Sequence, residues 1–314
     1  MTPDAAEAAE AAAVATTAKV GRPASSRTLL SRRARRRVVN SLAAGICLAF
    51  TLLACWPLLS VLWELWKRGR GAFSWSFVSQ TPHLDLTDLA HPVWHYGILH
   101  AIVGTGLVVA IGTAIGAPIG LLAGIWLAEG PGGRLAGFVR TFTEAMAGMP
   151  SIVAGLFGYA LLVASFGFSA WAGGVALSLL MLSPVTRTTE EALLAVPHGL
   201  REASMALGAP RWKTTVRIVV PAAWAGIVTG LLLSVSRISG ETAPLLLTVN
   251  TSAFLSYDPS QPVATLPGLI YSYGKAADPL QVEAAWGAAL VLILAILGVN
   301  LLVRFLSRRR KARA

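Results

Sequence analysis

The sequence predicts an all-α membrane protein with six transmembrane helices. Its 314 residues are 55% hydrophobic and only 13% charged, and its mean hydropathy is +0.64. An average soluble domain is about 25% charged, so this chain is too apolar to stay soluble as one globular domain. Six apolar stretches approach or exceed the roughly 20 residues that cross a bilayer. They are residues 38–66, 98–128, 141–165, 170–187, 219–240 and 284–306.

The basic residues fall mostly on one side of these spans. Of the 26 lysines and arginines, 21 lie in the two terminal segments, between spans two and three, or between spans four and five. Because cytoplasmic loops carry an excess of Lys and Arg, both termini are expected to be cytoplasmic and the protein to be a multi-pass protein of the plasma membrane. The basic run at 32–37 is then expected to contact anionic membrane lipid rather than nucleic acid.

The chain is expected to contain one membrane domain with two short tails. Residues 1–37 are rich in Ala, Thr, Ser and Glu and end in basic residues, so we predict a disordered, basic cytoplasmic tail. Residues 38–306 form the six-span domain, and 307–314 form a basic cytoplasmic C-terminus. Span one is long and lacks a small-residue cleavage site, which favours an uncleaved anchor over a signal peptide.

Cysteine and histidine chemistry is not expected. Cys47 and Cys55 are eight residues apart in one helical span, which places them about 12 Å apart and excludes a mutual disulfide. His91, His95 and His100 follow a helical spacing, but no Cys or carboxylate joins them in a ligand pattern. We therefore predict interfacial packing for these histidines and no metal site.

Spans two and three carry stripes of small residues. Span two has glycines at strict four-residue intervals, which predict a smooth face against which another helix packs closely. They are Gly112, Gly116, Gly120 and Gly124. Span three has the related series Ala147, Ser151 and Gly155, with Pro150 beside it.

A polar segment between spans four and five has the pattern Glu202-Ala203-Ser204, three residues, Gly208, nine residues, Ile-x-x-Pro221. It predicts a helix, a turn and a second short helix. Gly208 permits the positive φ that reverses the chain after a helix, and Pro221 suits the first turn of the next helix. Small residues allow the first helix to approach another protein closely. From spacing alone, an ordinary loop with an amphipathic helix remains the alternative.

Span five contains Arg237 and Glu241 near its outer half. An ionised group in hydrocarbon costs several kcal/mol, so it should face a partner charge or a water-filled path. Four residues apart on a helix, the two side chains are able to form an ion pair. Two interpretations therefore stay open together, an intrahelical ion pair and the lining of a transport route. An arginine fork would suit an oxyanion such as phosphate.

The polar segment resembles the cytoplasmic coupling loop of ABC importer permeases, over about 188–220. The resemblance becomes more specific through three further passages, which are Met149–Phe157, 183–197 and the run from Arg237 to Pro244. They are similar to PstA-type permeases of high-affinity phosphate ABC transporters, and the likeness covers residues 38–306.

The resemblance implies the type I ABC importer permease fold and the inward transport of inorganic phosphate. It implies a sister permease, an ATPase subunit dimer and an extracytoplasmic phosphate-binding protein as partners. Because no Gly-x4-Gly-Lys-Ser/Thr loop occurs here, ATP and Mg²⁺ would be bound by the ATPase, and this chain would be neither an enzyme nor a holder of cofactors. The implied substrate-pathway residues are Arg237, Glu241 and Arg187. The implied ATPase-coupling residues are Glu202, Ala203, Ser204 and Gly208.

Rival functions remain. An ABC permease for another oxyanion (molybdate, sulfate or phosphonate) shares the loop around Gly208 and differs in the Arg237 region. A secondary carrier or channel also has six spans, but it has no use for a coupling loop. An intramembrane enzyme is disfavoured because the spans lack paired aspartates, a Ser with a partnered His, and a His-Glu-x-x-His motif.

Overall fold

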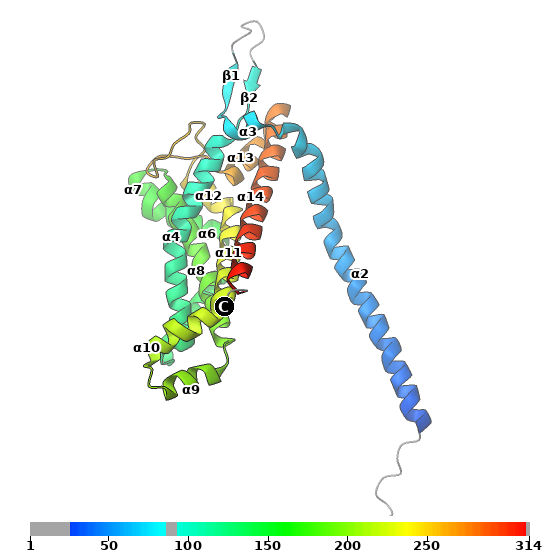
Figure 1. The fold of residues 1–314 in the computed structure, drawn as a ribbon. Coiled ribbons are helices and arrows are strands. Elements are labelled where there is room, and N and C mark those ends of the chain that lie inside the picture. Colours follow the sequence, from blue (N-terminus) through cyan, green and yellow to red (C-terminus); the bar gives the residue numbers. More distant parts are fainter. Residues whose placement is uncertain (1–25, 86–92, 312–314) are drawn as a thin grey trace, which may run out of the picture. The chain divides into compact units, whose positions relative to one another are not determined.

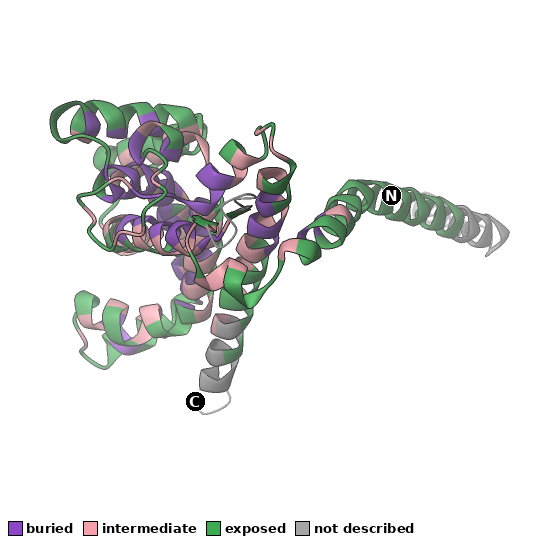
Figure 2. Ribbon diagram, turned by 90° about the horizontal axis from the view of Figure 1, so that it is seen from above, coloured by how far each residue is buried: buried purple, intermediate pink, exposed green. Residues whose placement is uncertain are grey.

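The computed structural model describes residues 26–85 and 93–311, and these are predominantly helical (Figure 1). The chain divides into two units, Met1–Trp63 and Glu64–Ala314. Helix α2, Ser26–Ala72, supplies all of the first unit that is described. Its side chains from 36 to 63 are exposed to the surroundings of the chain (Figure 2), as a lipid-facing span requires. Because α2 begins at Ser26, the last part of the predicted disordered tail is helical; residues 1–25 lie outside the described residues.

The described residues of the second unit form fourteen further helical or π-helical segments and one small sheet. Their bounds are α3 Trp75–Ser79, β1 His83–Asp85, β2 Val93–His95, α4 Leu99–Glu129, α5 Arg134–Ala147, α6 Ser151–Gly158, η1 Tyr159–Val163, α7 Ala164–Phe166, α8 Ala170–Leu194, α9 His198–Ala206, α10 Arg211–Thr214, η2 Thr215–Val219, α11 Val220–Ser239, α12 Ala243–Thr248, α13 Leu266–Tyr273 and α14 Pro279–Lys311. The segments η1 and η2 are short stretches of π-helix.

Four helices of the described residues are long and apolar enough to cross a membrane: Arg36–Ala72, Leu99–Glu129, Arg211–Ser239 and Pro279–Leu301. A fifth candidate is a bent pair, Arg134–Ala147 with Ser151–Phe166, which turns by 102°. The predicted third span, 141–165, is therefore broken at this bend in the described residues. Pro150 lies at the break, and a proline disfavours helical backbone in the residue before it.

The expected fourth span corresponds to α8, which runs on to Leu194. This helix is not among the membrane-span candidates of the described residues. Its last turns carry Arg187, Glu190 and Glu191, so the inner end of α8 is polar. The beginning of the predicted 188–220 loop is thus a continuation of the fourth helix.

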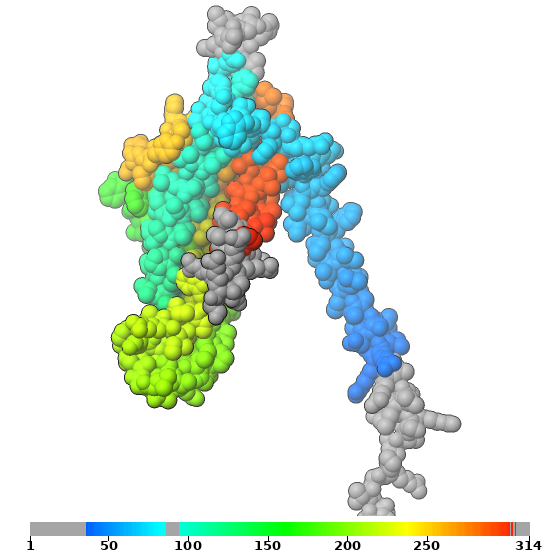
Figure 3. Space-filling view, in the orientation of Figure 1, coloured from blue at the N-terminus to red at the C-terminus, as the bar shows by residue number. Residues whose placement is uncertain are grey.

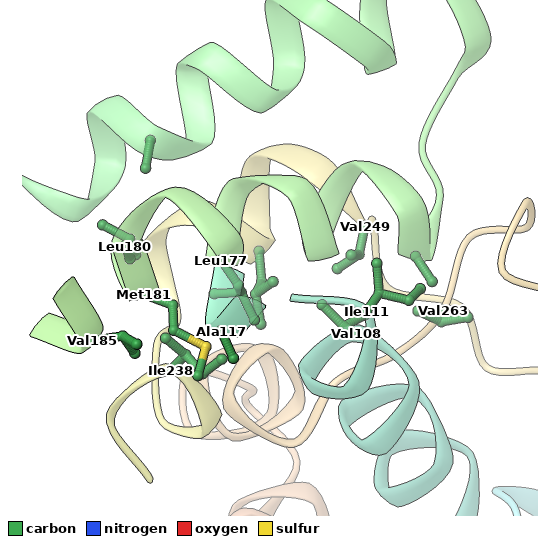
Figure 4. Packing of buried hydrophobic residues seen from close by; sticks show 13 residues of the cluster. Val108, Ile111, Ala117, Leu177, Leu180, Met181, Val185, Ile238, Val249 and Val263 are labelled. Atoms are coloured by element: carbon green, nitrogen blue, oxygen red, sulfur yellow. The ribbon is translucent and has the colours of Figure 1, made fainter. Parts of the chain in front are cut away.

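The glycine stripe of span two packs against α8, as predicted. A β-carbon added at Gly112 would lie 3.0 Å from the Cβ of Leu177, and one added at Gly124 would lie 2.6 Å from the carbonyl oxygen of Thr186. Just before the stripe in sequence, Val108 and Ile111 of α4 pack in the same buried cluster as Leu177 and Met181 of α8 (Figure 4). The α4–α8 pair is the centre of the second unit.

The segment between α11 and α14 folds back onto the helices. Gly155 of α6 lies so close to α12 that an added β-carbon would be 2.6 Å from the Cα of Pro244. At α13, the Leu266 backbone N–H donates to the buried Thr105 hydroxyl at 2.7 Å. These contacts place α12 and α13 at the end of the unit opposite α9 and α10 (Figure 1).

Strands β1 and β2 form an antiparallel hairpin in which His83 pairs with His95. The histidine spacing predicted a shared helix, and this was wrong, because His95 lies in a strand and His100 in α4. His91 lies outside the described residues. The segment around His95, Val-Trp-His-Tyr, is rich in residue types that favour strands.

Tyr96 fixes this hairpin to the start of α14. Its hydroxyl donates to Asp278 Oδ2 at 2.7 Å and accepts from Gln281 Nε2 at 3.2 Å, while its ring meets Tyr273 edge-on at 5.6 Å. Burial raises the pKa of the Tyr96 phenol, and the Asp278 carboxylate raises it further. The neutral phenol is therefore the form that holds the contact.

Candidate coupling and transport sites

The segment between α8 and α11 has the predicted shape of helix, turn and short helix. Helix α9 ends at Ala206, and Gly208 takes φ +82°. The Gly208 N–H donates to the Met205 carbonyl at 2.9 Å, and the Ala209 N–H donates to the Ser204 carbonyl at 3.2 Å. A glycine at positive φ thus closes the helix, and the chain reverses into α10. We call residues 198–214 the coupling hairpin.

Ser204 holds the two arms of the coupling hairpin together. Its hydroxyl is 2.8 Å from that of Thr214, and both residues are buried, with 5% and 3% exposure. By contrast, Glu202, Ala203 and Gly208 are exposed. Of the four residues predicted to couple to an ATPase, three therefore offer a free surface and Ser204 serves the hairpin internally.

The coupling hairpin continues directly into the fifth span. Helix α10, η2 and α11 follow without a break, and Pro221 lies in the first turn of α11, as predicted. The hairpin forms a lobe at one end of the second unit (Figure 3). At the far end of the same helical run lies Arg237.

Arg237 and Glu241 form the predicted contact, but loosely. The distance from Arg237 Nε to Glu241 Oε1 is 3.7 Å, and the arginine side chain stays 56% exposed while the glutamate is 18% exposed. Helix α11 ends at Ser239 with Gly240 as its cap, so the glutamate belongs to the turn after the helix. Most donors of Arg237 are consequently free to meet a partner.

Arg187 lies on α8 beside a charged cavity. Its Nε donates to Glu191 Oε1 at 3.0 Å, and the side chain is 66% exposed. The adjoining cavity has a volume of about 190 Å³. Besides Arg187, its charged lining residues are Arg140, Glu144, Glu190 and Glu191. Within it, Arg140 Nε donates to Glu190 Oε1 at 2.7 Å.

The predicted pathway arginines lie at different depths. Thr188 of α8 packs against Gly230 of α11, where an added β-carbon would be 2.2 Å from its hydroxyl. Arg187 is therefore near the level of residue 231, and Arg237 lies about 9 Å farther along α11 at 1.5 Å per residue. The two are separate positions along the unit rather than one site.

The sequence interpretation missed an ion pair at the base of the coupling hairpin. Arg201 of α9 binds Glu129, the last residue of α4, with NH2 to Oε1 at 2.6 Å. The available signals were a carboxylate at the end of span two and an arginine directly before Glu202. Arg201 and Glu129 are 72 positions apart in the sequence, so no local spacing pattern predicts that they form an ion pair.

That the protein holds no metal stays a prediction, and the structure bears only on the residues that it describes. There, no group of three or more His, Cys, Asp and Glu side chains is arranged to hold a metal ion. His83 and His95 stack on each other with ring centroids 5.3 Å apart. This stacking lies within the small hairpin.

Comparison with known proteins identifies the family. The family described as "Binding-protein-dependent transport system inner membrane component" matches residues 120–312. The "Phosphate transport system permease protein PstA" of Haemophilus influenzae is 39% identical over 279 residues, covering 88% of this chain and 96% of that protein. "Phosphate transport system permease protein PstA 1" of Mycobacterium tuberculosis strain CDC 1551 is 40% identical over 287 residues, covering 88% and 92%.

Solved structures agree on the fold. A bacterial ABC transporter involved in the import of the acidic polysaccharide alginate matches with a TM-score of 0.62 at 14% identity, covering 88% of this chain and 99% of that chain. An inward-facing MetNI methionine ABC transporter matches with a TM-score of 0.50 at 20% identity, covering 66% and 92%. The fold is that of a type I ABC importer permease. The chain belongs to the PstA family of phosphate transport system permeases, which are multi-pass inner membrane components of ABC transporters.

Proposed function

We propose that this protein is a transmembrane subunit that imports inorganic phosphate, driven by a separate ATPase and supplied by an extracytoplasmic phosphate-binding protein. Its curated relatives are named as phosphate transport permeases. In this proposal it pairs with a sister permease, and the ATPase dimer binds ATP and Mg²⁺. Both termini and the coupling hairpin face the cytoplasm, in keeping with the distribution of lysine and arginine.

The observation that carries the proposal is one uninterrupted helical run from the coupling hairpin to Arg237. The run Arg211–Ser239 is long and apolar enough to span a membrane. One of its ends belongs to the exposed hairpin, and the other presents a largely exposed guanidinium. A displacement of the hairpin by an ATPase would thus reach the outer part of the membrane domain through a single element.

Phosphate would be recognised by arginine. A guanidinium offers planar pairs of donors that match phosphate oxygens, and the 3.7 Å contact with Glu241 leaves Arg237 able to exchange partners. In an alternating-access cycle, the binding protein delivers phosphate near Arg237, and closure of the ATPases moves the coupling hairpin. The cavity beside Arg187 would be passed later, nearer the cytoplasm.

The substrate assignment is tested by uptake of labelled phosphate at low external concentration. The host cells lack their own permease of this type and receive the partner subunits with or without this chain. Uptake that depends on the chain and is not reduced by sulfate or molybdate supports the proposal. If uptake stays absent while the ATPase co-purifies with the chain, the substrate is another anion.

Arg237 is tested by Arg237→Gln, with Arg237→Lys as the matched variant that keeps the charge. We expect Arg237→Gln to lower phosphate flux about tenfold, an ordinary loss for one charged hydrogen-bonding group, without releasing the ATPase from the complex. Arg237→Lys should retain more flux because it keeps an electrostatic attraction to phosphate. Unchanged flux in Arg237→Gln would assign this arginine a structural role.

A further inference from the structure

The ion pair between Arg201 and Glu129 is partly buried at the junction of three helices. The guanidinium donates to Glu129 Oε1 through Nε at 3.0 Å and through NH2 at 2.6 Å. The two side chains are only 13% and 16% exposed. The Arg187–Glu191 pair, by comparison, is 66% and 62% exposed. A surface pair of that kind contributes little to stability, whereas the loss of one partner is more unfavourable when the pair is largely shielded from solvent.

Arg201 also closes the end of α8. NH1 donates to the Val196 carbonyl at 2.7 Å and NH2 donates to the Leu193 carbonyl at 2.8 Å. Carbonyls in the last turn of a helix lack partners within that helix, and a cation there also interacts favourably with the helix dipole. One side chain of α9 is thereby bound to the last residue of α4, to Leu193 in the last turn of α8 and to Val196 just after that helix.

Helices α4 and α8 already behave as one packed pair. The glycines of α4 bring the two backbones together along their length; at Gly116, for example, an added β-carbon would lie 2.9 Å from the Ser178 carbonyl oxygen. The coupling hairpin has no comparable packing of its own at α9, where Ser204 is the only buried residue of the helix. Among the described residues, the side-chain hydrogen bonds that join α9 to the ends of α4 and α8 all come from Arg201.

We propose that Arg201 is the positioning residue that locks α9 to the inner ends of α4 and α8, so that the three move as one body when the ATPase moves the hairpin. The inference rests on the proposed function. It requires the planar fork of arginine, because a lysine ammonium is a point charge that does not reach a carboxylate and two carbonyls in the same geometry.

The first experiment measures coupling in the complete transporter. Complexes with the partner subunits are placed in vesicles containing binding protein and phosphate, and uptake and ATP hydrolysis are measured together. We expect Arg201→Met to lower phosphate imported per ATP hydrolysed about tenfold, within the usual range of coupling between sites. Arg134→Met, an exposed arginine at the start of α5, is the control and should keep the ratio.

A purely structural role predicts a different result. In that case Arg201→Met lowers the amount of complex recovered while the import-to-hydrolysis ratio is unchanged, and this outcome overturns the proposal. Glu129→Gln keeps an acceptor oxygen and loses only the charge. If the complex that contains Arg201→Met does not assemble, Glu129→Gln tests whether the ion pair affects coupling. We expect a smaller fall in the ratio for Glu129→Gln, and an unchanged ratio would again overturn the proposal.

A second experiment does not depend on the substrate. Spin labels are attached at Gly199→Cys in α9 and Leu122→Cys in α4, with Cys47 and Cys55 replaced by serine. We expect a narrow distance distribution that ATP does not alter, and a broad one in Arg201→Met. A shift on ATP binding in the otherwise unmodified complex overturns the proposal. Failure of phosphate uptake by the unmodified complex would instead refute the proposed function and leave this distance measurement as the test of Arg201.

Discussion

Gly208 determines where the chain turns after α9. At φ +82° an L side chain costs about 1–2 kcal/mol, and only glycine and, to a lesser degree, asparagine adopt this region readily. No neighbouring atom lies within 4 Å of an added β-carbon, so the demand on this residue comes from its backbone rather than from packing. Glycine would therefore be required at position 208 whichever surface the hairpin contacts.

We therefore expect Gly208→Val to uncouple ATP hydrolysis from phosphate uptake while membrane insertion stays normal, because the strained backbone displaces the turn. Gly208→Asn, which tolerates positive φ better, should retain more of the coupled activity. Uptake per ATP is measured for both variants. Normal coupled uptake in Gly208→Val would contradict the role given to the coupling hairpin.

At the scale of elements, the α4–α8 contact depends on the absence of side chains. Gly116→Val would drive its β-carbon toward the Ser178 carbonyl oxygen at 2.9 Å and the Met181 β-carbon at 3.1 Å. Overpacking of this kind costs about 1–3 kcal/mol. Gly106 lies on the same helix and has no atom within 4 Å of an added β-carbon, so Gly106→Val is the matched control.

Thermal unfolding in detergent should separate the two variants. Gly116→Val is expected to lower the unfolding temperature, because the backbone of α8 must move away to admit the valine. Gly106→Val should unfold like the unmodified protein. Equal unfolding temperatures for both variants would mean that the glycine stripe does not limit the distance between the helices.

The Tyr96 clasp is a second test at this scale. Tyr96→Phe removes the hydrogen bond to Asp278 and keeps the ring against Tyr273, so we expect a loss of about 1 kcal/mol in unfolding free energy. The raised pKa of Tyr96 means that the folded state favours the protonated phenol. Its contribution is present below the ordinary tyrosine pKa of 10.0 and is lost as pH rises through the higher folded value.

Unfolding measured at neutral pH and above pH 10 checks this sign. The stability difference between the unmodified protein and Tyr96→Phe should be present at neutral pH and shrink once the phenol ionises. A difference that grows with pH would mean that the phenolate is the favoured form.

For the whole molecule, the sequence was sufficient for four of the apolar spans, the glycine stripe, and the helix and turn around Gly208. These depend on local composition and spacing. It did not predict the 102° bend in span three, because a proline such as Pro150 is compatible with either a kinked span or a break. Nor did it predict the contact of Arg201 with Glu129, which depends on helices brought together by packing far from either residue.

The proposed orientation is testable by labelling in whole cells. Leu207 in the coupling hairpin is 89% exposed and Phe254, between α12 and α13, is 81% exposed. Single cysteines at these positions, with Cys47 and Cys55 replaced, are treated with a membrane-impermeant maleimide. We expect Phe254→Cys to react in intact cells and Leu207→Cys to react only after permeabilisation. The reverse pattern would place the hairpin outside the cell and contradict the proposed function.

The π-helical stretch η2, Thr215–Val219, has a consequence for the angular phase of the fifth helix. A π turn bonds residue i to i+5 and so accommodates one residue more than an α turn. Each α-helical residue turns the chain by about 100°. Because the wide turn absorbs the extra residue, deleting a single residue there would restore α-helical bonding and leave the direction of the coupling hairpin nearly unchanged. A single residue inserted in the α-helical part of α11 has no such wide turn to absorb it, and it would rotate the hairpin by about 100° relative to the rest of that helix.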